Sequence, residues 1–82
     1  MEQEIGKVSH YYSKISVVVI ALSNALKVGD TIHIKGVHTD FQQTIESMQI
    51  EHEKIQEAKA GQSIGLKISQ PVHEHDTVYR VA

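Results

Sequence analysis

Short runs in which apolar and polar residues alternate make up much of this chain. Thr31–Lys35 (TIHIK) and Ile64–Ile68 (IGLKI) alternate, and Thr77–Val81 (TVYRV) is expected to be the last strand. Successive side chains of a β-strand point to opposite faces, so a period of two predicts strands with one buried face. In the first of these runs, Ile32 and Ile34 are expected to face a core.

Two longer runs near the start predict a hairpin. They are Ile5–Tyr12 and Ile15–Leu22, and only Ser13 and Lys14 separate them. The second run (ISVVVIAL) is β-branched and apolar on both faces, which is typical of a strand covered on both sides.

Between residues 41 and 52 the alternation changes phase. Phe41 and Ile45 have one parity, whereas Met48 and Ile50 have the other. A strict period of two cannot place all four on one face, so the pattern predicts a β-bulge near residues 46–47.

The charged segment from residue 47 to residue 61 (SMQIEHEKIQEAKAG) allows two interpretations. As a helix it would have a five-residue gap between Ile50 and Ile55, which fits a period of 3.6 poorly. As a strand followed by a loop, it ends the strand at Ile50, covers the end of the fold with Ile55 and turns at Ala60–Gly61. We expect the second arrangement because it leaves less apolar surface unaccounted for.

Four residues are expected to shape turns and close approaches: Gly29, Asp30, Gly61 and Gly65. Glycine accepts positive φ where most residues do not, and in a strand it marks a close approach of another backbone. Six or seven short strands separated by such turns predict an all-β fold. The specific prediction is a small closed or nearly closed β-barrel, with one domain over residues 1–82.

Composition narrows the function classes. The 82 residues carry a net charge of −2 and contain no Cys, so the chain has no disulfide and no thiolate metal site. This charge does not fit a protein that holds nucleic acid by bulk electrostatics. The longest apolar run is far shorter than the ~20 residues of a membrane span, so no membrane association and a cytoplasmic location are expected.

Two segments resemble the second domain of translational GTPases such as elongation factor Tu. One is Leu26–Asp30 (LKVGD), and the other is the signature from Ser47 through Glu57–Gly61 to Leu66. The resemblance implies a translation-factor-like β-barrel without its GTPase, because the chain has no G-x-x-x-x-G-K-[ST] loop and so no nucleotide is expected. A similar barrel also occurs at the C-terminus of a collagenase-like peptidase family and as short free-standing proteins. We expect the free-standing type.

That resemblance also implies a function. The second domain of elongation factor Tu helps hold the aminoacyl end of tRNA, and related domains contact ribosomal RNA. The resemblance places Gln49 and His52 at the family's contact position. The basic residues Lys54 and Lys59 flank them and are candidates for phosphate contacts. The expected function is therefore a non-catalytic accessory module that binds the ribosome, ribosomal RNA or tRNA. The alternative is a protein-interaction or homodimerisation module that uses an apolar edge of the hairpin over residues 11–22.

Catalysis, a cofactor and a metal site are not expected. The chain has no Cys nucleophile and no G-x-S-x-G pattern. In an extended segment His73 and His75 would point the same way and could supply two metal ligands. A structural zinc site needs about four ligands and a catalytic one about three, and no further spacing motif supplies them.

Overall fold

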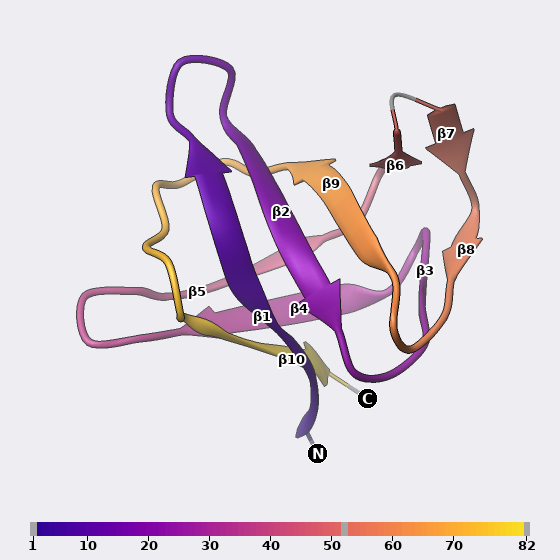
Figure 1. Cartoon of the computed structure of the whole chain (residues 1–82). Helices are drawn as coiled ribbons and strands as arrows, with labels where there is room; N and C mark the ends of the chain where they lie inside the picture. The colour runs from indigo at the N-terminus through magenta and orange to yellow at the C-terminus, as the bar shows by residue number, and fades with distance from the viewer. Residues whose placement is uncertain (1, 52, 82) are drawn as a thin grey trace.

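A computed structural model describes residues 2–51 and 53–81, and these residues form β-strands and connecting loops without a helix (Figure 1). In this part of the chain there is accordingly no helix long and apolar enough to cross a membrane. The ten strands are β1 (Glu2–Tyr12), β2 (Val17–Leu22), β3 (Leu26–Lys27), β4 (Thr31–Lys35), β5 (Asp40–Thr44), β6 (Met48–Ile50), β7 (Glu53–Ile55), β8 (Glu57–Ala58), β9 (Ser63–Lys67) and β10 (Thr77–Val81).

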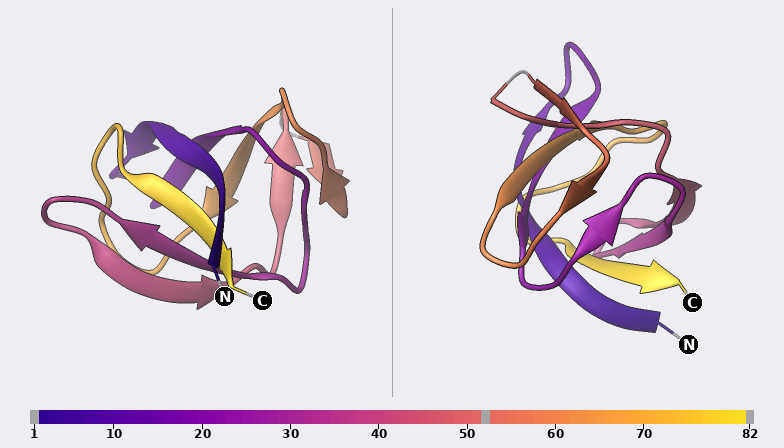
Figure 2. Two further views of the ribbon diagram at one scale, coloured as in Figure 1. Left: turned by 90° about the horizontal axis from the view of Figure 1, so that it is seen from below. Right: turned by 90° about the vertical axis from the view of Figure 1, so that its right-hand side faces the viewer.

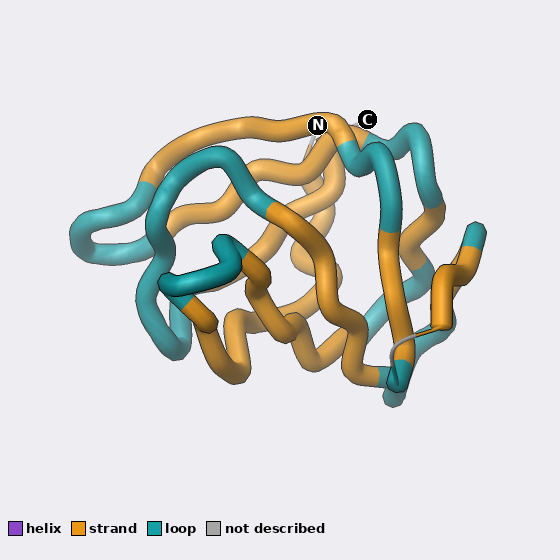
Figure 3. Tube along the Cα trace, turned by 90° about the horizontal axis from the view of Figure 1, so that it is seen from above, coloured by secondary structure: helices purple, strands orange, loops and turns teal. Residues whose placement is uncertain are grey.

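Eight strands form one antiparallel sheet in the order β5-β4-β10-β1-β2-β9-β6-β7, and β3 pairs with β8 in a separate two-stranded ribbon. The sheet curls strongly, so that its two halves face each other across a common interior (Figures 2 and 3). The prediction of an all-β fold is confirmed, but there are more strands than the six or seven expected. Among the described residues β5 and β7 remain edges of the sheet, so no closed barrel is seen.

Strand β1 joins the two halves of the sheet, and Gly6 lies where it passes from one to the other. This glycine pairs with Val78 of β10 on one side and with Leu22 of β2 on the other. The register of β1 shifts shortly before and shortly after it. A Cβ at position 6 would lie 2.4 Å from the carbonyl oxygen of Ala21. The bend therefore requires a residue without a side chain.

The inward faces of the strands form one hydrophobic core. Ile32 and Ile34 of β4 are fully buried, as predicted. In β2, by contrast, the core receives alternate residues only, beginning with Val18, while Val17 and Val19 are half-exposed. The expectation of a strand covered on both faces is therefore wrong, because β2 has the core on one side only. The buried apolar residues are Ile5, Val8, Val18, Ile20, Leu22, Leu26, Ile32, Ile34, Phe41, Ile45, Met48, Ala58, Ile64, Leu66, Ile68, Val72 and Val78.

The predicted hairpin at the start of the chain is confirmed, since β1 and β2 pair antiparallel from Gly6 to Leu22. Its position in the sheet differs from the expectation. Strand β2 pairs with β1 on one side and with β9 on the other, so it is an interior strand and offers no free edge.

The change of phase between residues 41 and 52 has a different cause from the predicted bulge. Strand β5 ends at Thr44, and β6 begins at Met48 with different partners. Strand β5 pairs with β4, whereas β6 pairs with β7 and β9. Ile45 and Met48 are both buried because the chain crosses from one end of the sheet to the other between them.

The segment from residue 47 to residue 61 contains no helix over its described residues, as expected. After Ile50 the chain forms two further short strands, β7 and β8, rather than a plain loop. Ile55 pairs with Met48 and packs against the core, and Gly61 lies in a turn with a positive φ of 89°.

Replacing Gly6 with alanine should destabilise the domain, because the added methyl group would collide with a backbone oxygen that cannot move independently. We expect Gly6→Ala to reduce the free energy of unfolding by about 1–3 kcal/mol, measured by urea denaturation. Gly65→Ala is the matched control, since its added Cβ would lie 3.7 Å from the nearest atom outside its chain neighbours. Equal stabilities for the two variants would refute this account of the corner.

Candidate functional site

Two of the residues predicted to contact RNA lie opposite each other on one small hairpin. Gln49 of β6 pairs directly with Lys54 of β7, and both side chains are exposed. Lys59 follows β8, in the other sheet, and its backbone N–H donates to the side-chain oxygen of Gln62 at 2.8 Å. His52 lies outside the described residues. The structure thus brings Gln49 and Lys54 together, whereas Lys59 lies just past the end of a separate ribbon.

The residues expected at turns have different surroundings. Gly29 has a φ of 99°, and a carboxylate oxygen of Asp30 accepts a hydrogen bond from the backbone N–H of Lys27 at 3.1 Å. Gly61 also has a positive φ. Gly65 differs from them, because it lies in the middle of β9 and not in a turn.

The two histidines considered as metal ligands do not lie on an extended strand. Residues 74–75 form a turn, and His75 has a φ of 74°. The Nδ1 atom of His73 lies 3.3 Å from the hydroxyl oxygen of Thr39. The backbone N–H of His73 donates to a carboxylate oxygen of Asp76 at 2.9 Å. In the described part of the chain, no three His, Asp or Glu side chains are grouped to hold a metal ion.

An apolar groove lies on the outer surface beside the β1–β2 hairpin. It has a volume of about 510 Å³ and is lined by Tyr12, Ile15, Val17, Val19, Gln49, Glu51, Ser63, Ile64 and Gly65. At its outer end Tyr12 is 48% exposed and Ile15 is 61% exposed. The sequence correctly indicated an apolar surface on this hairpin, but that surface is the outward face of β2 and not an edge of the sheet.

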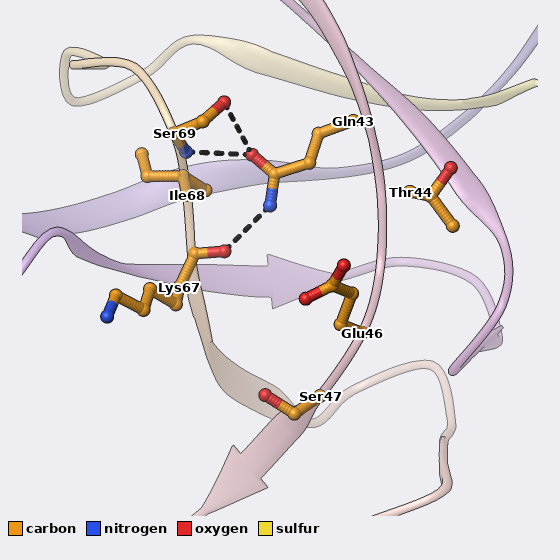
Figure 4. Close-up of a pocket in the computed structure, with 7 residues that line it drawn as sticks. All are labelled: Gln43, Thr44, Glu46, Ser47, Lys67, Ile68 and Ser69. Atoms are coloured by element: carbon orange, nitrogen blue, oxygen red, sulfur yellow. Dashed lines mark hydrogen bonds between the residues drawn. The ribbon is translucent and has the colours of Figure 1, made fainter.

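A second hollow, of about 360 Å³, lies between β5 and the end of β9, and a glutamine spans it (Figure 4). The side-chain nitrogen of Gln43 donates to the carbonyl oxygen of Lys67 at 2.7 Å. Its side-chain oxygen accepts from the backbone N–H of Ser69 at 2.8 Å and from the hydroxyl of Ser69 at 3.1 Å. A primary amide carries the same donor and acceptor as a peptide group. The side chain of Gln43 therefore bonds to the backbone of Lys67 and Ser69 in the way that a neighbouring strand would.

A charged cluster joins the start of the chain to β4 and β5. The Nδ1 atom of His33 bonds to a carboxylate oxygen of Glu2, and its Nε2 atom bonds to a carboxylate oxygen of Asp40. Only the doubly protonated ring donates from both nitrogens. The hydrogen bonds to Asp40 and then to Glu2 raise the pKa of His33 above 6.5, against the opposing effect of burial. The bond from His33 lowers the pKa of Asp40 below 3.8.

The structure resembles solved structures of one kind of domain. It superposes on the C-terminal domain of a Geobacillus thermoleovorans protein named as a U32 peptidase with a TM-score of 0.91, over 98% of this chain and 93% of that domain, at 19% sequence identity. The selenomethionine variant of the same domain gives a TM-score of 0.88, over 93% of this chain and 96% of that domain, at 20% identity. At this level of identity the comparison shows a shared fold.

A protein that is similar in sequence is also named as a protease. The chain is 44% identical over 77 residues to the uncharacterized protease MJ0090 of Methanocaldococcus jannaschii. The match covers 93% of this chain but only 19% of that protease, so the chain spans about a fifth of its length. No protein family model matches the chain.

These comparisons correct the functional expectation. The prediction of a free-standing module resembling the second domain of elongation factor Tu, with a role on the ribosome or on RNA, is wrong. The proteins it resembles are named as a protease and a peptidase, which also contradicts the expectation that the protein is not an enzyme.

Sequence reasoning missed the Gln43 bridge and the His33 cluster, because both depend on partners distant in the chain. His33 is 31 residues from Glu2, and Gln43 is 26 residues from Ser69. The alternation of β4 placed His33 on the outward face, and this was the available signal. A second signal for Gln43 is its parity in β5, which is the same as that of buried Phe41 and places it on the inward face of the strand.

The His33 cluster should make stability depend on pH. Because the pKa of His33 is raised on folding, its protonated ring contributes its full stabilisation below pH 6.5. This stabilisation is lost as the pH rises through the raised pKa of the folded state. Asp40 remains ionised over this range, since its lowered pKa affects stability only near and below 3.8. We expect His33→Gln to reduce the free energy of unfolding more at about pH 5.5 than at about pH 8.5. Urea denaturation at both pH values measures this difference.

The matched control for this prediction is His10→Gln, which removes an exposed histidine whose ring lies against Tyr12, 4.4 Å between centroids. A penalty for His33→Gln that is the same at both pH values would show that the ring acts by packing and not by charge.

Removing the amide of Gln43 should weaken the attachment of β5 to the end of β9. Gln43→Leu keeps a side chain of similar size but leaves the carbonyl of Lys67 and the N–H of Ser69 to water. We expect a loss of about 0.5–1.5 kcal/mol in unfolding free energy, seen as a fall in melting temperature of several degrees. Gln42→Leu, at the exposed neighbouring position, is the control and should have little effect. Equal losses for the two variants would contradict a bridging role.

Proposed function

We propose that this chain is a β domain that works with a U32-type peptidase by docking on the peptidase's catalytic body. The observation that carries the proposal is the sequence match, in which nearly the whole chain corresponds to one fifth of a protease at 44% identity. The shared fold with a C-terminal domain named as part of a U32 peptidase supports it. Docking requires an accessible surface, and the apolar groove beside the β1–β2 hairpin provides one.

The proposal includes the extent and shape of the domain. We take residues 1–82 as one folding unit, because the first described strand, β1, pairs with the last, β10. We also regard the curled sheet as close to a barrel. The β3–β8 ribbon supports this, since the N–H of Val28 bonds to the carbonyl of Gln56 and the N–H of Gly29 bonds to the carbonyl of Ile45, both at 2.9 Å.

A chimera tests the proposal. The segment of the M. jannaschii protease that matches this chain is replaced by residues 1–82, and the product is compared with the protease that lacks the segment. We expect the chimera to recover the melting temperature of the intact protease and its rate of hydrolysis on a peptide mixture, because this chain would restore the contacts of the missing domain. Calorimetry and mass spectrometry of the products provide the two readouts.

The control chimera carries an unrelated all-β domain of similar length at the same position. If residues 1–82 restore no more stability and activity than this unrelated domain does, the chain lacks the surface that a peptidase body recognises, and the proposed function is wrong.

A further inference from the structure

Gly65 is a glycine that the backbone does not require. The chain has five glycines. Gly29 and Gly61 have positive φ values, which favour glycine. Gly6 and Gly36 have no room for a side chain, since a Cβ would lie 2.4 Å and 1.9 Å, respectively, from the nearest atom. Gly65 lies in the middle of β9 without a positive φ, and its added Cβ would meet its neighbours at ordinary contact distances.

A glycine in the interior of a strand weakens that strand, so one that is not needed for folding suggests another use for the space. The atoms nearest to a Cβ at position 65 are Cγ1 of Val17, at 3.7 Å, and the carbonyl oxygen of Gln49, at 3.9 Å. Both residues line the apolar groove. The missing side chain therefore leaves space on the surface of the domain, and not in its core.

That space joins two hollows. The groove of about 510 Å³ and a smaller hollow of about 150 Å³ share the lining residues Val17, Gln49 and Gly65. The smaller hollow continues past Gly65 toward Ser47 and Lys67. A side chain at position 65 would narrow the junction between the two hollows, whereas glycine leaves them continuous.

The lining chemistry indicates what would bind there. The groove is mainly apolar, and Ile15, Val17 and Val19 project along one side of it. At the opposite side Gln49 offers an amide, which can donate to and accept from a peptide backbone. A surface of this kind fits an extended segment with apolar side chains, whose backbone bonds to the amide while a side chain covers Gly65.

We propose that this groove binds an extended apolar segment of the body of a U32-type peptidase, with one apolar side chain placed over Gly65. The inference rests on the proposed function. The occupant follows from the length of the relative, because the match accounts for only 19% of that protease and the other four fifths of the same chain is held close to the matched segment. Exposed Tyr12 and Ile15 extend the groove outward and would contact the same segment.

Binding in trans provides the test. The full chain is titrated into the M. jannaschii protease lacking its matched segment, and the affinity is measured by calorimetry. We expect Ile15→Ala and Gly65→Val each to weaken binding by roughly tenfold or more, the first by removing an apolar contact and the second by filling the junction. Val37→Ala is the matched control, since Val37 is 92% exposed on the β4–β5 loop and does not line the groove.

Gly65→Ala separates binding from folding. Its melting temperature should equal or exceed that of the wild type, because the added methyl group fits the strand, yet its affinity should fall. If Ile15→Ala and Gly65→Ala bind as tightly as the wild type, the groove inference is wrong while docking and the proposed function stand. If the wild type does not bind and the chimera also recovers neither stability nor activity, the groove inference and the proposed function are both wrong. Self-association that depends on Ile15 would assign the groove to a second copy instead.

Discussion

The fold depends on the close approach of β1 to β2 at Gly6. Here a single strand pairs with β10 through its first half and with β2 through its second half, and the two pairings overlap at this glycine. The carbonyl of Ala21 occupies the place where any Cβ would lie. Without this bend the sheet could not curl around a shared core, and the outward faces of β2 and β9 would not meet β6 at an angle that forms a groove.

The sequence predicted the strands well where the period of two was uninterrupted, as at Ile32 and Ile34, because a half-buried strand leaves its mark on every second residue. It failed where the burial of a residue depends on which strand lies beside it. The phase changes between Phe41 and Met48 because β5 and β6 pair with different strands and the chain crosses from one end of the sheet to the other between them. The pattern of apolar residues alone cannot distinguish such a crossing from a bulge. The interior position of β2 was hidden for the same reason. Gln43 bonds to partners 24 or more residues away, and His33 bonds to Glu2, 31 residues away. Pairings at that range follow from topology.

The mistaken translation role has a related cause. The resemblance depended on glycine and turn spacings such as those at Gly29 and Gly61, and these residues fulfil conformational requirements of the backbone. Such positions report the path of the chain, and a path can be shared by proteins of unrelated activity. Gly65 was grouped with the turn glycines for the same reason. The structure separates it from them, because at this position neither backbone conformation nor steric contact explains the glycine.

The attachment of β6 has a consequence for how selective the groove can be. Among the described residues, strand β6 pairs with β9 at a single position, Gln49 opposite Gly65, whereas it pairs with β7 at three. One wall of the groove is thus held by the five-residue ladder between β2 and β9, whereas the backbone of the other wall is joined to β9 at one paired position. Fewer backbone pairings would break if the β6 wall moved to accept a larger side chain than if the ladder between β2 and β9 opened. The groove should consequently discriminate weakly by side-chain size and more strongly by polarity, so that substitution of one apolar residue for another in the bound peptidase segment should be tolerated.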